Sequence, residues 1–139
     1  MQVGWENLQG FSEVYVAFED TNCLWWLRFL KPGFRHCYVI LVAAEKHAVV
    51  LLNPRSNRID VELYTSCDTK KFMTEFARKE GVTLCRVHME QTIFKPAPFM
   101  VFTCVEFVKR VLGVRNISII TPHQLYKKIK NSRKNILTF

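Results

Sequence analysis

The sequence predicts an α+β fold. Three consecutive segments rich in β-branched and aromatic residues are separated by short turns, which is the pattern of an antiparallel meander. The helical patterns stand apart from these strands instead of alternating with them, which argues against a parallel α/β sheet. No internal repeat and no linker rich in Gly and Ser interrupts the 139 residues, so we expect a single domain over residues 1–139.

The strands are predicted from alternation and from the turn residues between them. The Ala44–Lys46 turn separates the first two strands of the meander, and a turn cluster over Asn53–Asn57 separates the second from the third. An earlier alternating segment adds another strand, with an edge position as one option. In chain order the predicted strands are Ser12–Phe18, Phe34–Val42, His47–Leu52, Arg58–Tyr64 and Val82–Met89.

The helices are predicted from apolar spacing and from the residues at their ends. Pro32 ends the first helix, and Gly81 and Gly113 close the second and third. Thr103 is a natural N-cap for the third helix, and Pro122 stands in the first turn of the fourth, where its missing N–H costs nothing. The predicted helices are Asn22–Leu30, Asp68–Glu80, Cys104–Leu112 and a basic C-terminal helix and tail over residues 121–139.

The chain is basic, with a formal net charge of +8 and a pI near 9.4. A positive cluster near the C-terminus is interrupted by no acidic residue from His123 to Phe139. Such a cluster is either a solvated helix face or a weak contact for anionic polymers, made through charge alone. Its residues are Lys127, Lys128, Lys130, Arg133 and Lys134.

The apolar segments and the cysteines argue against several protein classes. No apolar run approaches the ~20 residues of a membrane span, so we expect no integral membrane association. Residues 1–10 lack the pattern of a secretory signal, so we expect a cytoplasmic protein. Leu24–Trp26 is expected to pack in the core, with a groove wall or a membrane contact as alternatives. The odd number of cysteines argues against a disulfide framework, and the absence of a C-x-x-C motif argues against a zinc site. No cofactor is predicted. These cysteines are Cys23, Cys37, Cys67, Cys85 and Cys104.

Cys104 is the cysteine whose position best suits nucleophilic chemistry. It directly follows the predicted N-cap Thr103, so it lies in the first turn of a helix, where the helix dipole favours a thiolate. Its own backbone N–H has no partner inside the helix and is available to an oxyanion. The alternative is a small residue packed beneath a helix start. Cys37 is expected to be a core residue.

His36 is the candidate base, at the start of a predicted strand. If the Ala44–Lys46 turn is tight, counting along the hairpin places Asn53 opposite His36, where its amide can orient the imidazole. The result is a Cys-His-Asn triad. Asp60 on the next strand is a rival orienting residue, because the register is uncertain by a residue or two.

Two motifs resemble those of permuted papain-like enzymes. Phe102–Gly113 (FTCVEFVKRVLG) is similar to the Asn-Cys-Glu-x-Phe-Val nucleophile helix of lecithin:retinol-acyltransferase-like and other permuted NlpC-type proteins, and Gly33–Ile40 (GFRHCYVI) is similar to their base strand. The order of His, polar residue and Cys is the permuted one. The resemblance implies a papain-like fold in which an antiparallel meander packs against the nucleophile helix. It also implies a thioester acyl-enzyme that is hydrolysed or transferred.

Departures from the motif weaken the assignment to the lipid-acting branch. Thr103 stands where that branch has asparagine, and its glutamate is displaced to Glu106. His47 has nearly the spacing of that branch's second histidine and is an alternative orienting residue, yet it falls at a turn. Small chains of this kind also resemble phage- and prophage-encoded members, which would work in the host cytoplasm or the virion.

Three functions are therefore compared. The first is a cysteine peptidase or amidase, acting on a peptide or amide substrate such as a cell-wall peptide, with Cys104, His36 and Asn53 as its site. The second is a basic non-catalytic module, either a phage structural protein or one associated with nucleic acid. The third is a lipid acyltransferase or esterase.

Overall fold

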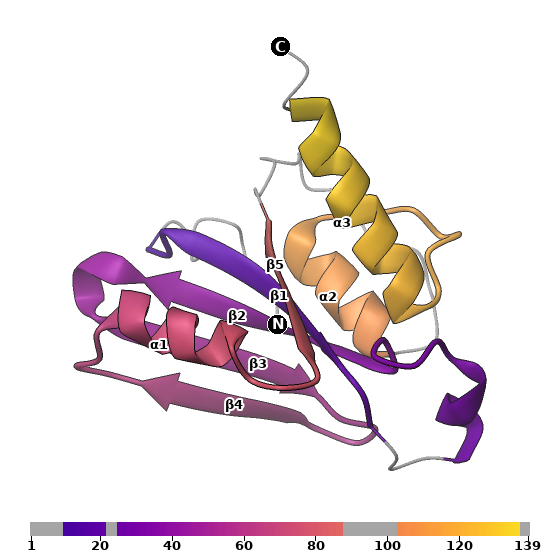
Figure 1. Cartoon of the computed structure of the whole chain (residues 1–139), viewed down its shortest axis with the longest axis horizontal. Helices are drawn as coiled ribbons and strands as arrows, with labels where there is room; N and C mark the ends of the chain where they lie inside the picture. The colour runs from indigo at the N-terminus through magenta and orange to yellow at the C-terminus, as the bar shows by residue number, and fades with distance from the viewer. Residues whose placement is uncertain (1–9, 22–24, 88–102, 137–139) are drawn as a thin grey trace.

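The computed structural model describes residues 10–21, 25–87 and 103–136. Within these ranges the chain forms a five-stranded antiparallel sheet and three α-helices, which confirms the predicted α+β class (Figure 1). Two short 3-10 helices, η2 and η3, lie in loops. The elements are β1 (Glu13–Glu19), η2 (Trp25–Phe29), β2 (His36–Ala43), η3 (Ala44–Lys46), β3 (Ala48–Pro54), β4 (Ile59–Tyr64), α1 (Thr69–Ala77), β5 (Val82–Val87), α2 (Cys104–Leu112) and α3 (Pro122–Ile136).

The sheet has the order β4-β3-β2-β1-β5. The predicted antiparallel meander is confirmed, because β2 pairs with β3 and β3 with β4. The edge position considered for the first strand is wrong: β1 pairs with β2 on one side and with β5 on the other. Strand β5 enters after α1 and takes the edge, so β1 and β2 are both interior strands.

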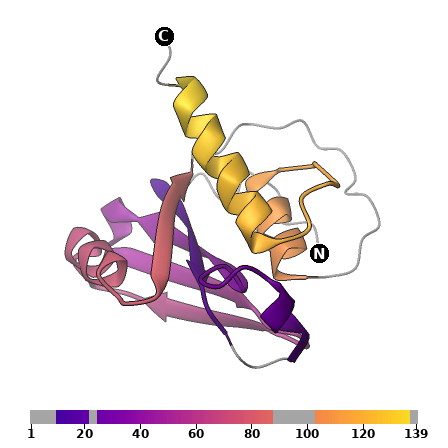
Figure 2. The same ribbon diagram turned by 45° about the vertical axis from the view of Figure 1, so that its right-hand side comes forward.

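The two faces of the sheet carry separate cores. On one face, Val39 and Leu41 of β2 pack with α2 and α3, whose contributions include Val108 and Leu125. On the other face, Ile40 packs with the α1 side of the molecule. Figure 2 shows α1 on one side of the sheet and α2 and α3 on the other. Because both faces are covered there, all eight residues of β2 are buried, as expected for an interior strand.

Helix ends follow their local signals, with small differences from the predicted bounds. Asp68 caps α1 by accepting from the backbone N–H groups of Lys70 and Lys71. The helix stops at Ala77 and not at Glu80, because the next N–H groups bond three residues back and tighten the chain. Gly81 then takes a left-handed φ of 78° as the chain enters β5.

The remaining helices differ in how closely they match the predictions. Helix α2 has the predicted bounds, with Gly113 closing it at φ 70°. The segment predicted as a helix over Asn22–Leu30 is the short 3-10 helix η2 in its described part. Met89 and residues 137–139 lie outside the described residues. In the described part of the chain, no helix is both long enough and apolar enough to cross a membrane.

Candidate active site

Cys104 is the first residue of α2. Thr103 has the extended backbone of an N-cap, and its Oγ1 accepts a hydrogen bond from the backbone N–H of Glu106 at 3.2 Å. The helix therefore begins at the nucleophile candidate, as the sequence predicts. The backbone N–H of Cys104 has no carbonyl partner within the helix, because the first four N–H groups of any α-helix lack one.

The environment of the Cys104 sulfur favours its ionised form. A side-chain hydrogen bond from Cys37 and a hydrogen bond and charge interaction with His36 lower the pKa of Cys104 to about 5. Burial opposes this change but does not outweigh it. The site thus holds a thiolate at neutral pH, which is the nucleophilic form of cysteine.

Cys37 has a role at this site that the sequence analysis did not assign. It is fully buried in the core, as expected, yet its thiol also reaches the Cys104 sulfur. Burial, followed by the interaction with Cys104, raises the pKa of Cys37 well above its usual value. Cys37 therefore keeps its proton and donates it in a hydrogen bond to the Cys104 thiolate. Its position next to His36 in the sequence was the available signal, but the prediction of a core residue gave Cys37 no part in the site.

His36 is buried at the start of β2, where Asn53 of β3 holds its ring. His36 Nε2 lies 2.7 Å from Asn53 Oδ1. Because an amide oxygen only accepts, Nε2 must carry the proton, which leaves Nδ1 as the nitrogen that can exchange a proton with Cys104. Burial lowers the pKa of His36, but the combined effects of Cys104, Asn53 and Glu19 outweigh it, so the pKa is raised above 6.5.

The hairpin register differs from the simple count, although Asn53 does reach His36. Val39 pairs with Leu52, and continuing this register by one residue sets Asn53 opposite Tyr38. The amide therefore reaches the imidazole diagonally. The difference arises because Ala44–Lys46 forms a full 3-10 turn, followed by His47 in the left-handed conformation, so the connection is longer than a tight turn.

Asp60 lies beside Asn53 in the sheet but is engaged with two cations. Its carboxylate accepts from Arg55 Nε at 3.0 Å and from Arg58 Nε at 2.7 Å. These contacts, led by Arg58, lower the pKa of Asp60. The carboxylate is thus committed to the turn that joins β3 to β4, and Asn53 is the side chain that holds His36.

His47 lies at the opposite end of β2 from His36. Eight residues of extended chain separate the two ends of this strand, a span of roughly 23 Å at ~3.3 Å per residue. His47 is exposed, and its backbone carbonyl accepts from the N–H and the thiol of Cys67. It is therefore a turn residue and not an orienting group for the candidate site.

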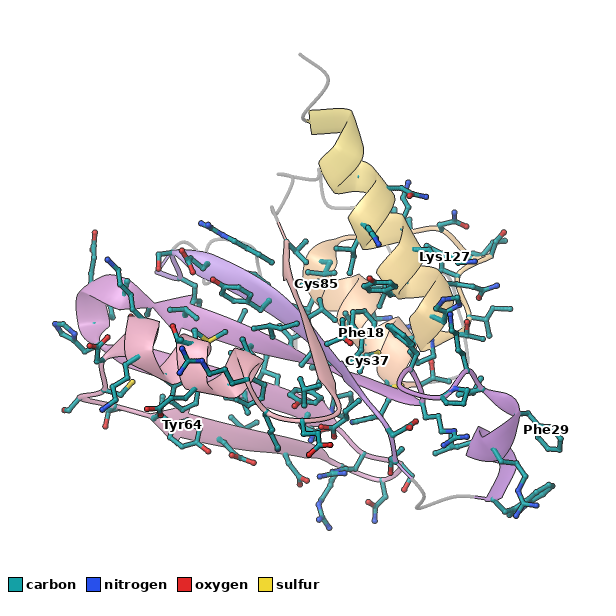
Figure 3. The ribbon with its side chains drawn as sticks, viewed as in Figure 1. Phe18, Phe29, Cys37, Tyr64, Cys85 and Lys127 are labelled. Carbon is teal, nitrogen blue, oxygen red and sulfur yellow. The ribbon has the colours of Figure 1, made fainter. Side chains whose placement is uncertain are left out.

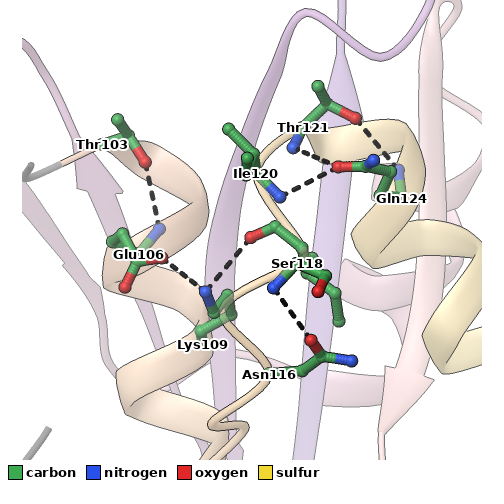
Figure 4. Close-up of polar contacts among 9 residues, drawn as sticks. Thr103, Glu106, Lys109, Asn116, Ser118, Ile120, Thr121 and Gln124 are labelled. Carbon is green, nitrogen blue, oxygen red and sulfur yellow. Dashed lines mark hydrogen bonds and ion pairs between the residues drawn. The ribbon is translucent and has the colours of Figure 1, made fainter. Parts of the chain in front are cut away.

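Helix α2 is fixed to the following loop by a buried ion pair. Lys109 Nζ donates to the Glu106 carboxylate and to the Ile119 carbonyl, the latter at 3.1 Å (Figure 4). Both charged side chains are buried, at 2% and 6% exposure for Lys109 and Glu106 respectively. The sequence carried a signal for this pair, because Glu106 and Lys109 stand three residues apart in the helix and Lys109 shares a helix face with Val105, Val108 and Leu112.

The site contains no feature of a metal centre in the described part of the chain, where no group of three or more His, Cys, Asp or Glu side chains converges. Comparison with models of protein families, with curated proteins and with solved structures found no match.

Proposed function

We propose that the chain is a cysteine hydrolase, a peptidase or amidase of the permuted papain-like type. Cys104 is its nucleophile, His36 its base and Asn53 the residue that orients the base. One observation carries the proposal: a thiol with its pKa lowered to about 5 begins a helix and interacts with a histidine that an asparagine holds. Catalytic nucleophiles need this combination of a depressed pKa and an oriented base.

In the proposed reaction, the Cys104 thiolate attacks the carbonyl carbon of the scissile amide. The negative charge moves to the carbonyl oxygen, where the backbone N–H of Cys104 stabilises it. Imidazolium His36 donates a proton to the departing amine as the C–N bond breaks, which leaves a thioester on Cys104. Neutral His36 then takes a proton from water, the resulting hydroxide adds to the thioester, and the acid product leaves as the thiolate re-forms.

The pKa directions define the pH range of the active form. Thiolate forms as the pH rises through about 5, and the raised pKa of His36 keeps the imidazole protonated above pH 6.5. Cys104 and His36 therefore exist as thiolate and imidazolium from about pH 5 up to the raised pKa of His36. Since the two groups titrate together, activity measures the apparent pKa values of the pair.

The position of His47 favours amide hydrolysis over lipid acyl transfer. A second histidine near the nucleophile would support the lipid-acting alternative, but His47 lies at the far end of β2 and is not in contact with Cys104. A peptide or amide substrate, with cell-wall peptides as one class, is therefore the preferred proposal. Lipid esters belong in the same assay as the competing class.

The test is turnover of a substrate panel by the wild-type protein and two cysteine variants. The panel comprises fluorogenic peptide amides, peptidoglycan stem peptides and short-chain lipid esters. We expect Cys104→Ala to abolish turnover and Cys67→Ala, at a partly exposed thiol beside α1, to retain it. Turnover that survives in Cys104→Ala would contradict the proposal. Absence of turnover on every class would favour the basic non-catalytic module, for which the exposed lysines of α3 are the supporting feature.

A further inference from the structure

The short helix η2 exposes two aromatic side chains, and one of them, Trp25, was expected to pack in the core. Trp25 is 71% exposed and Phe29 79% exposed, whereas Leu27 between them is buried. The two rings contact each other edge to face, with centroids 6.4 Å apart. Figure 3 shows Phe29 pointing away from the body of the molecule. Exposed aromatic residues of this size at one turn are unusual on a monomer surface and mark an interaction site.

Basic residues surround this aromatic pair. Arg28 and Lys31 are both exposed, and Arg28 Nε donates to the Trp25 carbonyl at 3.1 Å. Lys31 Nζ donates to His123 Nε2 at 3.1 Å, which joins the η2 loop to the start of α3. Lys127 lies one turn further along α3, and burial together with the charges of Lys31 and Lys127 lowers the pKa of His123. Phe29 and Lys127 lie on the same side of the molecule in Figure 3.

The one acidic residue in the connection that contains η2, Asp20, is paired with Arg35 at 3.4 Å and does not offset the charge of Arg28 and Lys31. No Asp or Glu follows Glu106 in the sequence, and Glu106 itself is buried against Lys109. On α3, the exposed Lys127 and Lys130 follow His123 at i+4 and i+7 and so form one cationic face of the helix. Aromatic residues with adjacent cations are the composition that binds the interface of a negatively charged bilayer, where rings enter the headgroup layer and cations remain at its surface.

We propose that η2, with Arg28, Lys31 and the cationic face of α3, is a docking surface for anionic lipid bilayers. The surface, called here the η2 surface, binds peripherally through Trp25 and Phe29. In the edge-to-face pair the edge of one ring covers a face of the other, which leaves fewer ring faces open for stacking of successive bases, so single-stranded nucleic acid is the less suitable occupant.

The η2 surface lies next to the candidate active site along the chain. Glu19 pairs with His36, so the connection that contains η2 leaves the sheet and returns to it at the base candidate. Docking would therefore turn this end of the sheet toward the bilayer. The binding proposal does not depend on catalysis, because its test measures binding alone.

The test is co-sedimentation of the full chain with vesicles of phosphatidylcholine, with and without phosphatidylglycerol. We expect binding to the anionic vesicles only, weakened by added salt, and reduced roughly tenfold or more in the double variant Trp25→Ser, Phe29→Ser. The matched control is Val61→Ser, Leu63→Ser on edge strand β4, whose side chains are 62% and 63% exposed and lie beside acidic residues. This control should bind as the wild type does.

Several outcomes would overturn the proposal. These are no binding to anionic vesicles, equal loss in the two double variants, or binding that the η2 variant leaves unchanged. Tighter binding to a single-stranded oligonucleotide than to vesicles, lost in the η2 variant, would assign the surface to nucleic acid instead. Thermal unfolding of each variant checks that the exposed substitutions leave the fold intact.

Discussion

The pH dependence of Cys104 alkylation follows directly from its environment. With a pKa of about 5, Cys104 is roughly 90% thiolate at pH 6, whereas an ordinary cysteine with a pKa of ~8.5 is ~0.3% ionised. The larger thiolate fraction alone would make alkylation of Cys104 at pH 6 about 300-fold faster than that of an ordinary cysteine. A thiolate of lower pKa is also a weaker nucleophile, and a Brønsted slope of ~0.45 cancels roughly 40-fold of that advantage. The net expectation at pH 6 is labelling that is faster by about tenfold.

The shape of the pH profile separates ionisation from accessibility. Between pH 6 and pH 9 the Cys104 rate should stay nearly constant, while the rate of an ordinary thiol rises roughly 200-fold. Limiting iodoacetamide with peptide mapping by mass spectrometry measures each cysteine separately. An accessible thiol with an ordinary pKa could be labelled quickly, but it could not show a flat profile.

Cys37→Ala is the perturbation that tests the origin of the low pKa. A hydrogen bond to a charged group contributes about 1.5–3 kcal/mol, and one pKa unit corresponds to ~1.4 kcal/mol, so the labelling midpoint should rise by about one to two pH units. Cys85→Ala is the matched control, because it removes a buried thiol from the same core on β5. A midpoint unchanged by Cys37→Ala, or shifted equally by both variants, would refute the reasoning.

Three further predictions concern the base, the helix and the charge. Asn53→Ala should lower turnover by less than His36→Ala does, because it removes the group that orients the imidazole and leaves the proton acceptor in place. Asp60→Asn should have little effect on turnover. If kcat/KM falls more in Asp60→Asn than in Asn53→Ala, Asp60 is the orienting residue. Lys109→Met should lower the free energy of unfolding, measured by urea titration, by about 3–5 kcal/mol, because it leaves the Glu106 carboxylate buried without its partner. A decrease below ~1 kcal/mol would show that the ion pair contributes little to stability. The basic cluster near the C-terminus should bind a short DNA duplex weakly, and its affinity should fall steeply as the salt concentration increases. Sequence-selective binding at physiological salt would contradict a purely electrostatic contact. The cluster consists of Lys127, Lys128, Lys130, Arg133 and Lys134.

The sequence was sufficient to predict the elements whose signals are local. Helix α2 begins at its Thr103 cap and ends at Gly113, so its bounds could be predicted from residues within one turn of each end. The meander was predictable because turn residues separate its strands. The interior position of β1 was not, because it depends on pairing with β5, a strand almost seventy positions away that arrives only after α1.

At the candidate site, tertiary packing decided what alternation could not. His36 and Asn53 were predicted as neighbours, and they are, but through a diagonal contact that reflects an extra 3-10 turn. Cys37 was predicted as a core residue and is buried, yet its thiol, like the His36 ring, also interacts with Cys104. Trp25 was expected in the core because tryptophan is usually buried, and only the structure shows that η2 turns Leu27 inward instead.

Detection of an acyl-enzyme by intact mass tests whether Cys104 acts as a catalytic nucleophile. The wild-type protein is mixed with an activated ester such as p-nitrophenyl acetate at pH 6, quenched in acid and weighed by mass spectrometry, with Cys104→Ala and Cys67→Ala in parallel. We expect one acetyl group on Cys104 in the wild type and in Cys67→Ala, released over time by hydrolysis, and no adduct in Cys104→Ala. An adduct that persists in Cys104→Ala, or one on Cys104 that forms no faster than those on other cysteines, would contradict this role.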